Sequence, residues 1–136
     1  MTYLFDVNAL VAFGFLEHEF HSRVAEWVGR SASRGDTELA TCSITELGFV
    51  RVLSQSPEYG LTVPEARSLL QRLKTGRTAK FRFLADDHDI SHLPAWVKTA
   101  KQLTDGHLAQ LAKANDGLLA TLDAKIPGSF LIPDVR

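Results

Sequence analysis

The sequence predicts an α/β fold in which helices cover both faces of a central parallel sheet. Short apolar runs alternate with longer segments in which apolar residues recur every three or four positions, as expected for strands that alternate with amphipathic helices. With 136 residues, 45% of them hydrophobic, the chain can build one sizeable core but is too short for two ordinary domains. We therefore expect a single domain over residues 1–136 with a three-layer α/β/α architecture.

The first half of the chain predicts two strands and three helices. An apolar run ends at Asp6 and is followed by apolar residues at helical spacing, and Trp27 and Val28 belong to a second such stretch. A Ser-Arg-Gly-Asp turn precedes the second strand, and Ser43 opens the third helix. In chain order we expect a strand at 3–5, helices at 9–16 and 19–33, a strand at 38–41 and a helix at 43–54.

The second half repeats the alternation. Pro64 lies in the first turn of a fourth helix that ends at Gly76, and Thr104 starts a last long helix. The strands between and after them are apolar and short. In chain order we expect a helix at 62–76, a strand at 81–84, a helix from 104, and strands at 118–122 and 130–132.

The charge balance makes any attraction to a polyanion local. Lys and Arg number 15 and Asp and Glu number 16, so the whole-molecule field does not favour nucleic acid. One basic stretch, from Arg67 to Arg82, fits a solvated helix face and its loop as well as it fits contact with RNA. Its members are Arg67, Arg72, Lys74, Arg77, Lys80 and Arg82.

The sequence also predicts a cytoplasmic protein. No apolar stretch approaches the roughly 20 residues that cross a bilayer, and Asp6 lies where a secretory signal has positive charge. The single Cys42 has no partner for an internal disulfide and no thiolate zinc spacing. We interpret Cys42 as a core residue.

Four acidic residues are candidates for a site, and each has a structural alternative. Asp6 precedes a helix, where an aspartate often caps the free backbone N–H groups. Glu46 follows Ser43 by three residues, which is the capping-box spacing. Asp105 lies in a first helical turn, where the helix dipole favours negative charge. Asp123 follows an apolar strand, in a segment where turn aspartates are common.

Their joint placement favours a metal site. Asp6, Glu46 and Asp123 lie at or just beyond the carboxyl ends of predicted strands or in the helix turns that follow those ends, at the edge where open parallel sheets bind ligands. If Asp105 joins them, up to four negative charges converge, and such charges resist ionisation unless a cation offsets them. Mg²⁺ or Mn²⁺ suits carboxylate oxygens and acts where phosphates are processed.

Four stretches of the sequence resemble the PIN-domain superfamily, and within it the VapC-type toxins of bacterial toxin–antitoxin pairs. The stretches are Leu4 to Leu10 (LFDVNAL), Thr41 to Phe49 (TCSITELGF), Leu103 to Leu108 (LTDGHL) and Ala120 to Asp123 (ATLD). The order, spacing and chain length agree from end to end.

The resemblance implies a PIN-like fold and a metal-dependent endoribonuclease that uses Mg²⁺ or Mn²⁺. It implies Asp6, Glu46, Asp105 and Asp123 as catalytic, metal-binding acids. Asn8 and Thr121 become hydrogen-bonding groups behind those acids. It also implies an RNA substrate, a cognate antitoxin that blocks the cleft with a basic side chain, and a homodimer.

Some residues are not explained by the resemblance. Position 7 is Val where many relatives carry a hydroxyl residue, so any side-chain contact made there is absent. Asp116 is expected in the turn before the last core strand, and His107 on a partly exposed helix surface. Trp27 and Trp96 could stack on bases, although such aromatic residues more often belong to a core or interface.

The expected mechanism is hydrolysis with water as the nucleophile. A carboxylate-held ion lowers the pKa of a bound water, orients the phosphodiester and offsets charge on the leaving oxygen. No histidine pair is required, so the products should carry 5′-phosphate and 3′-hydroxyl ends. A 2′,3′-cyclic phosphate would contradict this mechanism.

Three alternative functions are open to the sequence. A phosphohydrolase with Asp6 as covalent nucleophile usually has a second aspartate two residues later, where this chain has Asn8. A receiver domain needs an adjacent acidic pair near the first strand, and Tyr3 to Ala9 contains only Asp6. A catalytically inactive PIN-like binding module ranks below the enzyme because all four expected acids are present.

Overall fold

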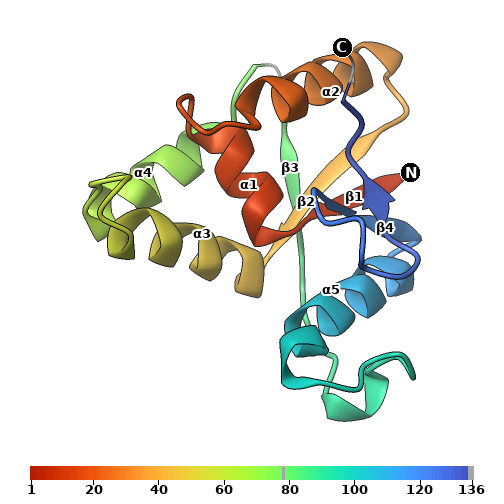
Figure 1. Ribbon diagram of the computed structural model, residues 1–136. Helices are drawn as coiled ribbons and strands as arrows, with labels where there is room; N and C mark the ends of the chain where they lie inside the picture. The colour runs from red at the N-terminus through yellow and green to blue at the C-terminus, as the bar shows by residue number, and fades with distance from the viewer. Residues whose placement is uncertain (78, 135–136) are drawn as a thin grey trace.

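The computed structural model describes residues 1–77 and 79–134, and its helices and strands alternate along the chain (Figure 1). The strands are β1 (Thr2–Phe5), β2 (Glu38–Cys42), β3 (Phe81–Leu84), β4 (Gly117–Thr121) and β5 (Phe130–Leu131). The helices are α1 (Val7–Gly14), α2 (His21–Arg34), α3 (Ser43–Gln55), α4 (Val63–Lys74) and α5 (Leu103–Ala114). Two short 3₁₀ helices, η1 (Ile90–His92) and η2 (Ala100–Gln102), lie between β3 and α5.

The sheet has five strands in the order β3-β2-β1-β4-β5, and every pairing is parallel. The chain builds outward from β1 to β2 and β3, and then returns to the other side of β1 with β4 and β5. The strand order therefore reverses beside β1. Ligand crevices in open parallel sheets form at the carboxyl ends of strands at such a reversal, so the residues after β1, β2 and β4 occupy the favoured place.

Two apolar cores hold the helices against the two faces of the sheet. One core contains residues of the four helices α1, α2, α3 and α4 together with strand residues such as Phe5 and Leu39. The other contains residues of α5 together with Leu4 and Ala40. Neighbouring residues of one strand thus face opposite cores, as the pleat of a strand requires. Figure 1 shows α1 to α4 grouped on one side of the strands and α5 on the other. The three-layer α/β/α prediction is confirmed.

Helices α1 and α3 pack closely against each other at Val7 and Gly48. A Cβ atom at Gly48 would lie 2.4 Å from Cγ2 of Val7, which is too short for any real contact. The absence of a side chain at Gly48 therefore lets α3 approach the start of α1 closely. This packing gives Val7 a structural role.

The predicted strands and helices are confirmed, with differences at their ends. The first helix ends at Gly14 rather than Leu16, the last begins at Leu103, and β5 is only two residues long. The sequence pattern predicted no structure between β3 and α5, where η1 and η2 lie. Cys42 and Trp27 are buried, as predicted. Among the described residues, no helix is both long enough and apolar enough to span a membrane.

Candidate metal centre

Asp6 is a buried carboxylate at the centre of the carboxyl edge. It follows β1 directly, and its Oδ1 accepts a 2.8 Å hydrogen bond from the backbone N–H of Ala9, so it caps α1 as the sequence suggested. Its Oδ2 accepts a 2.5 Å hydrogen bond from the Thr121 hydroxyl at the end of β4. The residue is 7% exposed. Helix capping therefore uses one oxygen of Asp6, and the other faces the end of β4.

Asp105 and Asp123 extend the negative charge around Asp6. Asp105 lies in the first turn of α5, and Asp123 follows β4. The pKa of Asp6 is raised to about 6, first by burial and then by the charges of Asp105 and Asp123, against the hydrogen bonds from Thr121 and Ala9, which lower it. Burial and then the charge of Asp123 raise the pKa of Asp105. The structure thus brings three of the four predicted acids within electrostatic reach of one another.

Thr121 joins two of these acids through one hydroxyl. Its Oγ1 donates to Asp6 Oδ2 and accepts a 3.0 Å hydrogen bond from the backbone N–H of Asp123. The side chain is fully buried. Asn8, predicted for a similar supporting role, is exposed in the first turn of α1.

Glu46 has its own partners. Its Oε2 lies 2.6 Å from Nζ of Lys74 and accepts a 2.6 Å hydrogen bond from the Thr41 hydroxyl. The capping-box alternative for Glu46 is wrong, because α3 begins one residue earlier than that spacing requires. Cys42 precedes the helix, and its N–H donates to the Thr45 hydroxyl at 3.0 Å. The Glu46 carboxylate therefore takes no part in capping α3. Its negative charge is paired with the Lys74 ammonium group.

The donor set fits a hard divalent cation. Carboxylate oxygens are the ligands that Mg²⁺ and Mn²⁺ prefer, and the pKa values of Asp6 and Asp105 are raised by burial and, to a smaller extent, by the neighbouring acids. Within residues 1–77 and 79–134, no three Asp, Glu, His or Cys side chains are grouped tightly enough to hold an ion. A bound cation would offset the repulsion between neighbouring carboxylates.

Asp116 lies away from these acids, as the sequence suggested. It occupies the turn between α5 and β4, with a positive φ of 57°. That turn is at the amino end of β4, whereas Asp6 and Asp123 are at the carboxyl ends of their strands. Asp116 therefore belongs to the opposite edge of the sheet.

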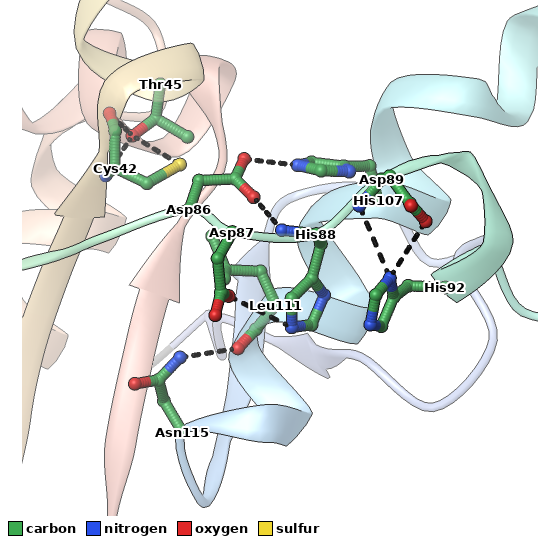
Figure 2. A network of polar contacts seen from close by, with 10 residues as sticks. All are labelled: Cys42, Thr45, Asp86, Asp87, His88, Asp89, His92, His107, Leu111 and Asn115. Atoms are coloured by element: carbon green, nitrogen blue, oxygen red, sulfur yellow. Dashed lines mark hydrogen bonds and ion pairs between the residues drawn. The ribbon is translucent and has the colours of Figure 1, made fainter.

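Asp86 and His107 form a contact that the sequence analysis missed. Asp86 lies just after β3 and its Oδ2 contacts Nε2 of His107 in α5, with both side chains less than one-fifth exposed (Figure 2). Burial acts to raise the pKa of Asp86, but hydrogen bonds from the His107 ring and the backbone N–H of His88 outweigh it and hold that pKa below its usual value. The available signal was an acid two residues after a strand, whereas Asp6 follows its strand directly. The pair ties β3 to the helix that carries Asp105.

Replacing Asp86 should weaken this connection. We expect Asp86→Ala to lower the free energy of unfolding by about 1–2 kcal/mol, the cost of losing a partly buried, charge-assisted hydrogen bond. Urea denaturation at neutral pH measures the change. Asp87→Ala is the matched control because the Asp87 side chain is 94% exposed. Equal stability of the two variants would show that the Asp86–His107 contact does not hold α5.

The fold and the acids define a parallel α/β protein with a carboxylate cluster where the strand order reverses. Comparison with known proteins gives the family. The PIN domain family matches residues 3–127. Ribonuclease VapC38 of Mycobacterium tuberculosis is 39% identical over 90% of this chain and 86% of its own length. Ribonuclease VapC29 of the same species is 37% identical over 91% of this chain and 87% of its own.

A solved structure has the same fold. The crystal structure of VapBC2 from Rickettsia felis, bound to a DNA fragment from their promoter, contains a chain that superposes with a TM-score of 0.62. The alignment covers 96% of this chain and 97% of that chain at 16% identity. This chain belongs to the PIN domain family.

Proposed function

We propose that this chain is a metal-dependent endoribonuclease that hydrolyses RNA phosphodiester bonds. The observation that carries the proposal is the buried Asp6 carboxylate, whose pKa is raised to about 6 with Asp105 and Asp123 among the causes. A buried acid among like charges is poised to bind a cation. Relatives named ribonucleases, 37–39% identical to this chain, supply the reaction class.

Four acids would hold the ion, with Mg²⁺ or Mn²⁺ as the natural choices. Asp6, Asp105 and Asp123 already act on one another electrostatically, and Glu46 would join them when Lys74 releases its carboxylate. When bound, the ion would lower the pKa of an attacking water and offset charge on the phosphate. Thr121 and the N–H of Ala9 would keep the Asp6 oxygens oriented.

Cleavage of RNA with and without chelator tests the proposal. Purified protein should cut single-stranded RNA in Mg²⁺ or Mn²⁺, lose that activity in EDTA, and recover it when the metal is restored. The new ends should be 5′-phosphate and 3′-hydroxyl, because water is the nucleophile. Cleavage that persists in EDTA, or 2′,3′-cyclic phosphate ends, would contradict the proposed mechanism. No cleavage with either metal would favour an inactive binding module.

We also propose that the chain is the toxin of a cytoplasmic toxin–antitoxin pair. The relatives named VapC and the fold shared with the VapBC2 structure support an antitoxin partner. Co-expression with the product of the adjacent gene should yield a complex that does not cut RNA. A homodimer is the expected state of the chain alone, and a monomer at micromolar concentration in light scattering would contradict it.

A further inference from the structure

Lys74 connects the candidate metal centre with a second surface. Its Nζ lies 2.6 Å from Oε2 of Glu46 and 5.6 Å from the centre of the Phe83 ring. The Lys74 side chain is 25% exposed, so its ammonium group is within reach of solvent and of a ligand. A cation–π contact of this kind is weak at a solvent-exposed site. One ammonium group thus bridges a predicted metal-binding acid and an aromatic ring.

Phe83 is an exposed aromatic ring beside Lys74, the partner of Glu46. It belongs to β3 and is 48% exposed, whereas Phe5, Phe49 and Phe81 are buried. An exposed phenyl ring gains nothing from the core, but it offers a flat face on which a nucleobase can stack. Because β3 pairs with β2, Phe83 is opposite Thr41, the residue whose hydroxyl binds Glu46.

A groove of about 490 Å³ runs from this place between α3 and α4. Residues of α3 and α4 line the groove, together with Phe83 of β3. Its lining includes Glu46, Leu47, Val50, Arg67 and Phe83. Arg67 and Lys74 are seven residues apart on α4, which places them on the same helix face. Among the residues that line the groove Arg67 is cationic, and Lys74 adds a second positive charge at the Glu46 end through its ion pair.

We propose that Lys74 and Phe83 form a nucleotide subsite for single-stranded RNA next to Glu46, in which Phe83 stacks on a base and Lys74 binds a phosphate of that strand. The inference rests on the proposed ribonuclease function. Charge complementarity favours RNA as the occupant, since Arg67 in the groove and Lys74 at its Glu46 end can each pair with a phosphate of a strand that reaches this acid. The base would cover the exposed ring, and the phosphate would take the ammonium group from Glu46.

Movement of the Lys74 ammonium group from Glu46 to a phosphate would couple substrate binding to the release of the Glu46 carboxylate. The ammonium group of a lysine is a compact charge on a flexible four-carbon stem, so it can move from a carboxylate to a phosphate. While Lys74 pairs with Glu46, the two charges cancel. When Lys74 binds phosphate instead, the Glu46 carboxylate becomes available as a ligand.

RNA binding measured without cleavage tests the subsite. We would use the Asp6→Asn background in Mg²⁺ and a fluorescein-labelled single-stranded RNA of about 12 nucleotides, a length typical of single-strand sites. Phe83→Ala should lower the affinity about tenfold without changing its salt dependence, because stacking involves no counterion release. Lys74→Met should lower the affinity about fivefold and reduce the salt slope by about 0.7, the value for one phosphate contact.

Conservative and distant variants control for the fold. Phe83→Tyr and Lys74→Arg should retain most of the affinity, since ring and charge remain. Leu16→Ser removes an apolar side chain that is 79% exposed and lies outside the groove, and it should leave RNA affinity unchanged. An equal loss of RNA affinity in Leu16→Ser and Phe83→Ala would overturn the subsite, because it would show that the effect of Phe83 is not specific to its place. Thermal melts of each variant identify any that unfold.

The outcomes separate this inference from the proposed function. If the unsubstituted protein cuts RNA in Mg²⁺ while Phe83→Ala and Lys74→Met bind RNA normally in the Asp6→Asn background, the subsite is wrong and the ribonuclease stands. If the unsubstituted protein neither cuts nor binds RNA, both fail. Affinity losses in both variants, with the salt slope reduced only for Lys74→Met, would support the subsite.

Discussion

Asp6→Asn should reduce metal-dependent RNA cleavage by about 1000-fold or more. Asparagine removes one negative charge at the centre of the acids, and the charge stabilisation that a metal site supplies is worth several kcal/mol, with about 4 kcal/mol equal to 1000-fold in rate. The fold should persist because asparagine caps helices as well as aspartate does. Cleavage of labelled RNA under single-turnover conditions measures the loss.

The same substitution should stabilise the protein when no ion is bound. The pKa of Asp6 is raised from 3.8 to about 6, so between these values the folded protein keeps a proton that the unfolded chain has released. The free energy of unfolding therefore falls as the pH rises through this window, by at most about 3 kcal/mol, and levels off above it. Asp6→Asn should lack this decrease, and Asp105 should cause a smaller one in the same direction.

Urea denaturation in EDTA from pH 4 to pH 7 measures both effects. Asp116→Asn is the matched control, since it makes the same change at the opposite edge of the sheet. The control should keep its activity and the pH dependence of the unsubstituted protein. If Asp6→Asn cuts RNA normally, Asp6 is not a ligand, and if it is inactive but less stable at pH 7, its loss of activity reflects the fold instead.

The placement of Asp6 and Asp123 followed from the sequence because each follows an apolar strand. The carboxyl ends of parallel strands share an edge, and β1 and β4 proved to be neighbours. A residue directly after a strand has little freedom to lie elsewhere. The charges of Asp6 and Asp123 could therefore be expected to meet, whereas Asp105, in the first turn of α5, follows no strand and its approach depended on how that helix packs.

Contacts of Glu46 and Asp86 could not be predicted in this way. The Lys74–Glu46 pair joins the last residue of α4 to the first turn of α3, and it depends on how two helices pack, which no local pattern specifies. The Asp86–His107 contact depends on the segment between β3 and α5, which has no hydrophobic periodicity. The capping error at Glu46 came from a shift of one residue in the start of α3, a typical uncertainty at helix ends.

Thr121→Val should weaken metal binding by about 10- to 100-fold, the effect of removing a hydrogen-bond partner behind a metal ligand. Valine has nearly the shape of threonine but leaves Asp6 Oδ2 without its hydroxyl donor and the Asp123 N–H without its acceptor. The hydrogen bond from Thr121 lowers the pKa of Asp6, so its loss should raise that pKa further and increase the competition between protons and the ion.

Calorimetric titration with Mn²⁺ at pH 6 and pH 8 measures this effect, since the deficit of Thr121→Val should be larger at pH 6. Thr2→Val is the matched control. Thr2 is also a buried strand threonine, but its hydroxyl donates to Glu38 at the amino edge of the sheet. Equal metal affinity in Thr121→Val and Thr2→Val would mean that the Thr121 hydroxyl stabilises only the fold. A deficit confined to Thr121→Val would identify Thr121 as the residue that holds Asp6 ready for the ion.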